Sequence, residues 1–491
     1  MRIILLRSLC TIAAIAALMP ANAADNDVER LVAAMLGDTP VVDDLHELTD
    51  SIGGRVTGSD ANRSAVAWAA TKLQQAEVTV MTEDFQMPAV WQESFVAVAI
   101  SGDAAFDANA VAKPFSVSAN ALAGPLLDAG FGSEADFERL GVSAKAAWLL
   151  VETPVLDDDA GLGGLFAEYA EAPGFEARAA AIGAAGVVVM SSRPKNLVFR
   201  HNAAAGRKNT QALLVLEREH AQRALRLLRS GNSLSLAATI GVEQQENVTA
   251  TNVIAEIKGS SRPDEIVLFG AHLDSHDLGT GALDNGVNVV MLINIARQIT
   301  RLGLQPQRTI RFALWNGEEQ NLDGSWKYTQ QHEDELDNHI VAASFDIGSG
   351  RTTGFFTGGR PQLVPLVDRY LTPVAGLGPF QQIDIPLVGT DNYDFMMQGV
   401  PNLIANQSDA NYASNYHAES DTFDKVDLQQ LRLNSAIAAA VIWGFANDTA
   451  RLPRQTHAEI EALINSTDLE QQMKNFAVWD TWVDESRGRH D

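Results

Sequence analysis

The sequence of 491 residues contains a single cysteine, Cys10, close to the amino terminus. A chain with one thiol cannot form an internal disulfide bond, and it cannot build the thiolate sites that hold many structural zinc ions. Any site for a transition metal must therefore use histidine and carboxylate side chains. The sequence supplies 10 histidines and 62 acidic residues from which such a site could be built.

Positive charge is also scarce. The sequence has 36 lysines and arginines against 62 aspartates and glutamates, which gives a formal net charge of -26. Such a surface repels phosphate groups, and this argues against nucleic acid or an anionic membrane as a partner. We expect the charge to keep the protein soluble in an extracytoplasmic setting.

Beyond the first residues, the sequence lacks an apolar run long enough to cross a bilayer. Residues 1–23, MRIILLRSLCTIAAIAALMPANA, combine a basic start, a short apolar middle and the small-x-small pattern Ala21-Asn22-Ala23. This combination is typical of a cleavable signal peptide. We therefore expect secretion to the periplasm or the medium, a mature chain that begins near Ala24, and the loss of Cys10.

The length of the chain predicts more than one domain. Helical and strand-like patterns alternate in residues 24–101, and the same alternation resumes in residues 244–453. We expect these segments to be two parts of one α/β catalytic domain. The Ala-, Gly- and Leu-rich residues 102–243 between them predict an inserted, non-catalytic domain that covers or shapes the entrance to the site. For the polar tail, residues 454–491, a docked helix and a loose end are equally open.

The inserted segment contains two histidines, His201 and His220, that stand apart from any cluster of carboxylates. An isolated histidine is far more often solvated than bound to a metal. We therefore expect both side chains to be exposed and to take no part in a metal site.

Acidic and imidazole side chains follow two apolar, strand-like runs. The run IVLFG leads to His272 and Asp274, and the run TIRFALWN leads to Glu318 and Glu319. Ligand groups of an open α/β sheet collect beyond the carboxyl ends of its strands. Two adjacent acids in an apolar context repel each other unless a cation lies between them. One can bind metal while the other accepts a proton from water; a solvated charged loop is the alternative.

Three further residues complete the set of candidate ligands. Asp284 stands in the Gly-rich loop GTGALDNG, where its carboxylate could bridge two cations or cap a turn. Asp346 ends the apolar run IVAASFD, and His417 lies in NYHAESDTFDKVD. Together with His272 and Glu319 they provide two imidazoles and three carboxylates. That set is enough for two zinc ions that share one bridging acid.

The order of these motifs resembles that of the two-zinc exopeptidases, a family that includes aminopeptidase Y, aminopeptidase S, glutamate carboxypeptidase and carboxypeptidase Q. The resemblance runs from LTDSIGGRVTGS through HLDS, GALDNG, LWNGEEQ, SFDIGSG and GTDNYDFMMQGVP to YHAESDTFD. Within the family, the sequence is most similar to the carboxypeptidase Q branch. The resemblance implies a mixed central sheet flanked by helices, and the inserted segment resembles a protease-associated domain.

The resemblance also implies a role for each candidate ligand. His272 and Asp346 would serve one zinc ion, Glu319 and His417 would serve the other, and Asp284 would bridge the two.

Four neighbours of the ligands receive roles in the same way. Glu318 would be the general base, Asp274 the carboxylate behind His272, and Tyr416 a residue that steadies the oxyanion. Asp391 is expected to face the cleft without an assigned task. His276 stands where sequences of the carboxypeptidase Q branch more often have tryptophan. We interpret it as a neighbour that does not bind metal, with contact to the substrate as the alternative.

These features predict a di-zinc exopeptidase that hydrolyses a terminal bond of a peptide or dipeptide, with Glu318 as the general base. The sequence leaves open which terminus is recognised, the preferred side chain and whether the chain forms a homodimer. A first alternative is a single-zinc enzyme like the glutaminyl cyclases, which cyclise an amino-terminal glutamine. A second is a binding protein on an inactive peptidase scaffold.

Overall fold

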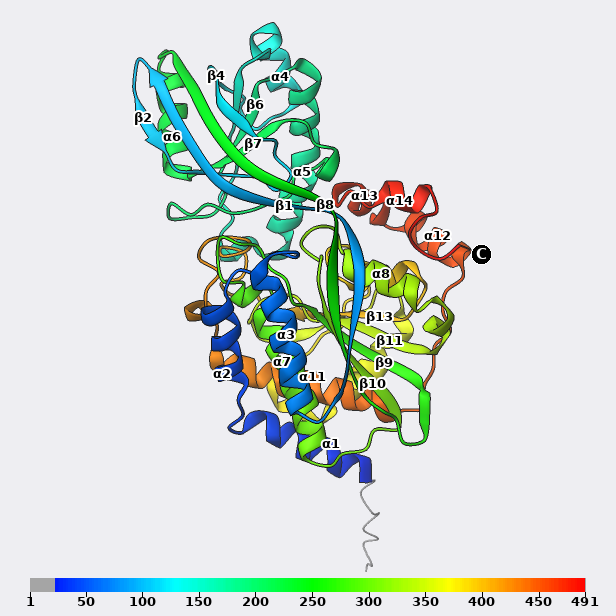
Figure 1. Ribbon diagram of the computed structural model, residues 1–491. Coiled ribbons are helices and arrows are strands. Elements are labelled where there is room, and N and C mark those ends of the chain that lie inside the picture. The colour runs from blue at the N-terminus through cyan, green and yellow to red at the C-terminus, as the bar shows by residue number, and fades with distance from the viewer. Residues whose placement is uncertain (1–22, 491) are drawn as a thin grey trace, which may run out of the picture.

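The computed structural model describes residues 23–490 (Figure 1). The helices are α1 Ala23–Leu36, α2 Val41–His46, α3 Asp60–Gln75, α4 Glu134–Leu140, α5 Gly161–Ile182, α6 Arg218–Arg229, α7 Val287–Arg301, α8 Asp323–Gln331, α9 Val364–Tyr370, α10 Asn392–Met397, α11 Leu428–Asn447, α12 His457–Ser466, α13 Leu469–Asn475 and α14 Trp479–Val483. The strands are β1 Thr79–Gly102, β2 Phe106–Ala108, β3 Ala110–Ala112, β4 Ala119–Asp128, β5 Trp148–Val151, β6 Gly186–Met190, β7 Ala212–Leu216, β8 Leu234–Ile257, β9 Arg262–His272, β10 Arg308–Trp315, β11 His339–Ser344, β12 Thr352–Phe356 and β13 Asn402–Gln407. The expected signal peptide, apart from Ala23, and Cys10 lie outside the described residues.

A mixed sheet with helices on both faces forms the larger body. Its strands follow the order β12, β13, β11, β9, β10 and β8. The four central strands are parallel, whereas β12 and β8 run antiparallel to their neighbours. Along β9, Val267 and Phe269 pack into the core with α1, α3, α7 and α11, while Leu268 packs on the other face against α8 and α10. This alternation is the two-residue period of a strand, and the predicted α/β fold is confirmed.

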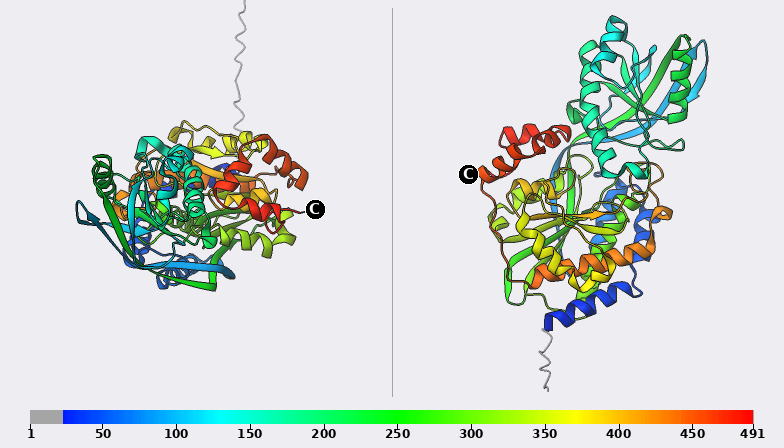
Figure 2. Two further views of the ribbon diagram at one scale, coloured as in Figure 1. Left: turned by 90° about the horizontal axis from the view of Figure 1, so that it is seen from above. Right: turned by 180° about the vertical axis from the view of Figure 1, so that it is seen from behind.

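The second body contains a parallel set of strands, β4 to β7, with β3 at its edge. It has its own apolar core, centred on residues such as Trp148, Leu149 and Leu214. The long strands β1 and β8 pair with each other almost from end to end and connect the two bodies (Figures 1 and 2). The proposed boundary at 101/102 falls at the end of β1, and that at 243/244 falls inside β8. We retain residues 102–243 as a proposed inserted domain.

The apolar helix expected near the end of the catalytic domain is α11. It begins after Asp427, whose carboxylate accepts hydrogen bonds from the backbone N–H groups of Gln429 (3.0 Å) and Gln430 (2.9 Å). The side chains from Ala436 to Ala440 are buried in the main core. Across residues 23–490, none of the helices combines the length and the apolar character that a bilayer crossing requires.

The carboxyl-terminal tail is docked, which decides between the two alternatives left open by the sequence. Helices α12 to α14 place Ile460, Met473 and Trp482 in an apolar cluster with side chains of α10. The guanidinium of Arg487 donates two hydrogen bonds to the Asp394 carboxylate, both at 2.7 Å, and both side chains are almost fully buried. The tail is therefore held by apolar packing and by a buried ion pair.

Candidate metal centre

The parallel strands bring the predicted ligands to one edge of the sheet. His272 is the last residue of β9, and Asp346 follows β11 closely. Glu318 and Glu319 lie in the loop after β10, and His417 lies in the longer loop after β13. Because the carboxyl ends of parallel strands meet at the same edge, residues far apart in the sequence become neighbours.

The first group of possible ligands is formed by His272, Asp284 and Asp346. His272 Nε2 lies 2.9 Å from Asp346 Oδ1 and 3.0 Å from Asp284 Oδ1. On the other side of the ring, His272 Nδ1 lies 3.1 Å from the carbonyl oxygen of Asp274 and 3.6 Å from Oδ1 of the same residue. The backbone and the carboxylate of Asp274 thus hold the imidazole with Nε2 directed at the two acids.

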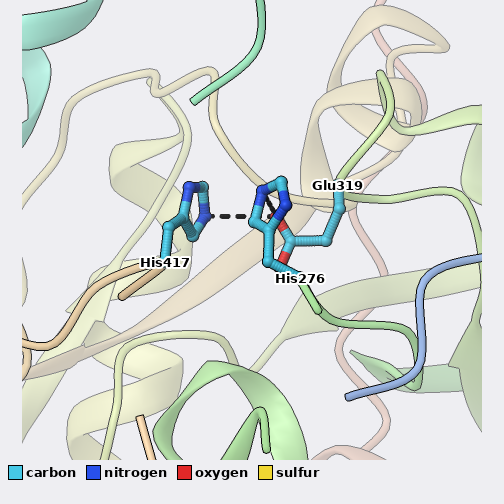
Figure 3. Close-up of side chains that lie close together, drawn as sticks. All are labelled: His276, Glu319 and His417. Carbon is cyan, nitrogen blue, oxygen red and sulfur yellow. Dashed lines mark ion pairs between the residues drawn. The ribbon is translucent and has the colours of Figure 1, made fainter. Parts of the chain in front are cut away.

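The second group is formed by His276, Glu319 and His417 (Figure 3). Glu319 Oε2 lies 3.1 Å from His417 Nε2 and 3.0 Å from His276 Nε2. Asp284 Oδ2 lies 3.4 Å from His417 Nε2, so the two oxygens of this carboxylate face different groups. His276 is much closer to the ligands than its interpretation as a mere neighbour suggested.

The inserted segment supports the second group through backbone atoms. His417 Nδ1 donates a hydrogen bond to the carbonyl oxygen of Arg200 (3.1 Å), and the N–H of Arg200 donates to the carbonyl of His417 (2.9 Å). The Asn202 amide donates to the backbone oxygen of Glu319 (2.7 Å). His417 has a φ angle of 57°, an uncommon value for a residue with a side chain and one often found at functional sites. These contacts fix the ring of His417 and could not be foreseen from local sequence patterns.

His201, which the sequence led us to expect in solvent, is buried, so that expectation is wrong. Its side chain is only 5% exposed, its ring centre lies 4.0 Å from that of Tyr169, and it lies 6.1 Å from the ring of His417. Burial lowers the pKa of His201 well below its usual value, and the nearby charges of Lys113 and His417 add to this effect. Tyr169 of the same inserted segment packs directly against the ring, whereas the ring of His417 lies farther away. His220, by contrast, is partly exposed.

Tyr416 and Asp391 differ in their access to the site. The Tyr416 ring stacks on His417 with centres 3.6 Å apart, and its hydroxyl lies 2.9 Å from that of Tyr169. Burial raises the pKa of the Tyr416 hydroxyl well above its usual value, which keeps its proton available for donation. Asp391 is buried, and the neighbouring Thr390 rather than Asp391 forms part of the pocket wall.

The two adjacent glutamates are electrostatically different. Burial raises the pKa of the Glu318 carboxyl well above its usual value; His272 opposes this shift, and Asp346 and Glu319 add to it. In Glu319 burial acts in the same direction, but His276 and His417 outweigh it and lower the pKa well below the usual range. Glu319 is therefore suited to remain a charged ligand, whereas Glu318 is suited to exchange a proton.

Unpaired buried atoms provide a test of whether metal ions fit this centre. Within the described part of the chain, Asp284 Oδ2, Glu319 Oε1 and His276 Nε2 are buried and lack a hydrogen-bond partner. Leaving such atoms unpaired is costly, and cations would satisfy them. The ligand atoms within each group of three also lie within 4.8 Å of one another. The residues present thus fit two metal ions, and Glu318 belongs to neither group.

An apolar pocket of about 620 Å³ opens beside the centre. Its walls include Leu162, Leu165 and Phe166 from α5 and Phe476, which follows α13, while Glu318 lies toward the ligands. A larger groove of about 1720 Å³ adjoins it and carries Arg207, Lys208 and Lys474 among its lining residues. Both the inserted segment and the tail therefore contribute walls to the space around the candidate ligands.

Asp323 closes the loop that carries the two glutamates, and its buried carboxyl group should make the stability of the fold depend on pH. The N–H of Asp323 donates to the carbonyl of Gly317 (2.9 Å), and its carboxyl is buried. Burial raises the pKa of this carboxyl from 3.8 to about 6, with Arg487 opposing the shift. The folded state then binds the proton more tightly than the unfolded chain does. Ionisation therefore costs stability as the pH rises from about 4 to 6, and the full cost of about 3 kcal/mol applies above pH 6.

Asp323→Asn should accordingly raise the melting temperature relative to the wild type at pH 7.5, and the difference should disappear near pH 4. Scanning calorimetry of both proteins across this range measures the effect. A difference in melting temperature that stays constant with pH would contradict the assigned cause.

Comparison with known sequences shows that the part of the chain that carries most of the candidate ligands is similar to a family of peptidases. Residues 252–442 match peptidase family M28. Carboxypeptidase Q from Bos taurus is 30% identical over 241 residues, which cover 48% of this chain and 50% of that protein. “Probable lipoprotein aminopeptidase LpqL” from Mycobacterium tuberculosis is 25% identical over 454 residues, with coverage of 84% and 85%. The chain thus spans about half the length of the carboxypeptidase Q sequences that it matches.

Solved structures show the same architecture. The peptidase M28 precursor from Shewanella amazonensis has 27% sequence identity and a TM-score of 0.80, covering 87% of this chain and 98% of that one. BSAP, a zinc aminopeptidase from Bacillus subtilis, has 19% identity and a TM-score of 0.64, with coverage of 84% and 96%. At that identity the second likeness supports the fold alone.

Proposed function

We propose that the chain is a member of peptidase family M28, whose model matches residues 252–442, and that it is a metal-dependent exopeptidase that hydrolyses a terminal peptide bond. The observation that carries this proposal is the position of Asp284. One of its carboxylate oxygens lies beside His272 and Asp346, and the other lies beside His417 and Glu319. A carboxylate placed in this way is suited to bridge two cations.

The residues around the centre have separate tasks in the proposed reaction. Two divalent zinc ions would supply Lewis acidity toward the scissile carbonyl and toward a water molecule. Glu318 accepts the proton of that water as it attacks, and it returns the proton to the nitrogen of the leaving amine. The Tyr416 hydroxyl donates a hydrogen bond to the carbonyl oxygen as charge develops on it. Asp274 and the carbonyl of Arg200 keep the imidazoles of His272 and His417 in place.

The charge of the surrounding pockets favours the amino terminus of a peptide. Among the described residues that line the 620 Å³ pocket there is no lysine or arginine, whereas Asp284, Glu318 and Asp346 are present. A free carboxylate would find no lysine or arginine side chain there, whereas a free amine would lie near Glu318, an acid outside the two groups of proposed metal ligands. The rest of the peptide, with its carboxylate, would extend into the groove that contains Arg207 and Lys208.

The apolar walls predict a preference for a bulky apolar terminal residue. Burying a leucine or phenylalanine side chain contributes about 1.5–3 kcal/mol, which corresponds to roughly 10- to 150-fold in kcat/KM over aspartate at the same position. Phe166→Ala should reduce this preference because it removes one wall. The exposed Phe131 of the same segment provides a matched control, and Phe131→Ala should leave the preference unchanged. Equal cleavage of leucyl and aspartyl substrates by the wild type would contradict the assignment of the pocket.

Two measurements separate this function from its alternatives. A single-zinc enzyme like the glutaminyl cyclases would bind one ion per chain, whereas the two groups of ligands support two. Digestion of a mixed peptide library, followed by mass spectrometry, identifies the terminus from which residues are lost. Two bound zinc ions and amino-terminal trimming are expected. One tightly bound zinc with cyclase activity, or no hydrolysis of any peptide with zinc supplied, would contradict the proposal.

The pattern in residues 1–23 supports the further proposal that the protein acts outside the cytoplasm.

A further inference from the structure

We infer that His276 is an additional metal ligand, which completes a site of two imidazoles and one carboxylate, from His276, His417 and Glu319, next to the shared Asp284. The inference rests on the proposed metal centre and deepens it. It departs from the roles that the motifs imply, which assign only Glu319 and His417 to this ion besides Asp284.

The backbone that carries His276 is held firmly on both sides. Arg55 is fully buried and donates hydrogen bonds to the carbonyl oxygens of Leu273 (2.5 Å) and Gly281 (2.9 Å), at the two ends of this loop. The guanidinium of Arg200 binds the carboxylate of Asp277, the next residue, at 2.8 and 3.0 Å. Such fixation limits the positions that the imidazole can adopt, as a preorganised ligand requires.

The interatomic distances match those of atoms that share an ion. His276 Nε2 and His417 Nε2 lie 3.0 and 3.1 Å from the same oxygen, Oε2 of Glu319. The centres of the two rings are 4.2 Å apart, and Figure 3 shows both rings beside the carboxylate. Two atoms bound to one zinc ion at about 2.0–2.1 Å in a tetrahedral arrangement lie about 3.3 Å apart. The observed spacing is close to that value.

A hydrogen bond between His276 and Glu319 does not account for this contact. Although the atoms are only 3.0 Å apart, His276 Nε2 has no hydrogen-bond partner of suitable geometry within residues 23–490. A hydrogen bond needs alignment as well as distance. A cation between the ring and the carboxylate would satisfy both groups.

His276 does not line the proposed substrate pocket. It lines a small space of about 180 Å³ together with Asp284, Glu319 and His417. Neither the 620 Å³ pocket nor the larger groove includes His276 among its described lining residues. A role in contacting the substrate therefore has less support than a role in binding metal.

The added imidazole would make the two metal positions unequal. Asp284 is counted at both positions. The first position would then have one imidazole, from His272, and two carboxylates, and the second would have two imidazoles and two carboxylates. Four protein ligands fill a tetrahedral site, as in structural zinc sites, and three leave a position open. The open position for water or substrate would then lie on the side of His272 and Asp346.

Nuclear magnetic resonance of protein labelled with 15N-histidine and loaded with 113Cd²⁺ tests the inference directly. Coupling between cadmium and Nε2 should appear at His272, His276 and His417, and the signal assigned to His276 should be missing in His276→Ala. Coupling at His272 and His417 alone would overturn the role of His276 and leave the proposed function intact. Absence of coupling at all three residues would contradict the metal centre itself.

Zinc affinities of variants provide a second test that does not depend on activity. Competition with a chelator measures both zinc affinities. His276→Ala should bind one zinc ion with the affinity of the wild type and the other at least about 100-fold more weakly. This estimate follows because loss of a residue that only orients a ligand already lowers metal affinity by about 10- to 100-fold. The matched control is His201→Ala, which removes another buried imidazole near His417 and should leave both affinities unchanged. Two wild-type affinities in His276→Ala would overturn the inference.

Discussion

Glu318→Gln is expected to lower kcat/KM for peptide hydrolysis by about 10²- to 10⁴-fold, which is the typical contribution of a well-placed general base. Glu318 lies in the pocket wall next to Asp284 and Asp346, but it belongs to neither group of ligands. The amide of glutamine has nearly the same shape as the carboxyl group and cannot accept the proton of the attacking water. The variant should therefore keep its metal content while losing turnover, as measured by kinetics and by elemental analysis of the same samples.

The neighbouring glutamate supplies the matched control. Glu319→Gln changes the same chemical group one residue away, where Oε2 lies close to His276 and His417. This substitution should weaken zinc binding, and its activity should recover in part when zinc is added in excess. Glu318→Gln should show no such recovery. Wild-type turnover by Glu318→Gln would refute the assignment of the base.

Arg487→Ala is expected to destabilise the protein by about 3–5 kcal/mol, because it leaves the Asp394 carboxylate buried without its partner. The two hydrogen bonds of this pair are both 2.7 Å long. The guanidinium also lies over the rings of Trp326 (4.8 Å) and Tyr393 (5.1 Å), so the substitution removes packing as well as charge. Hydrogen exchange of α12 to α14, together with denaturant unfolding followed by tryptophan fluorescence, measures the loss.

An exposed ion pair in the same tail serves as the reference. Lys474 and Glu470 lie one helical turn apart on α13, and both side chains are close to half exposed. Glu470→Ala should change the stability by about 0.5 kcal/mol or less. If Arg487→Ala cost no more than Glu470→Ala, the buried pair would not be what holds the tail.

The sequence predicted the candidate site residues best where they come directly after a strand. The apolar runs before His272, Glu319 and Asp346 became β9, β10 and β11, and their parallel arrangement places these residues at one edge of the sheet. Asp284 could be found because its Gly-rich loop opens directly into α7. The roles of these residues remain proposals, but their proximity follows from local patterns that any α/β sheet would produce.

Contacts made by docking were not predictable in the same way. His201 packs against Tyr169 of α5, a residue distant in the sequence, and no local pattern encodes that contact. The position of Phe476 in the pocket wall likewise depends on how the tail folds back. His276 did carry a signal, since it lies two residues beyond the H-x-D pair. Only its distance from Glu319 in space distinguishes a ligand from a neighbour.

The reciprocal hydrogen bonds between Arg200 and His417 have a consequence for how this chain can change over evolutionary time. Both bonds use main-chain atoms of residue 200, so they depend on the path of the backbone, whereas the guanidinium of Arg200 separately binds Asp277. A one-residue deletion nearby would shift the main-chain carbonyl away from the imidazole. A change in loop length near residue 200 should therefore disturb the position of the His417 ring, although the segment contributes none of the candidate ligands itself.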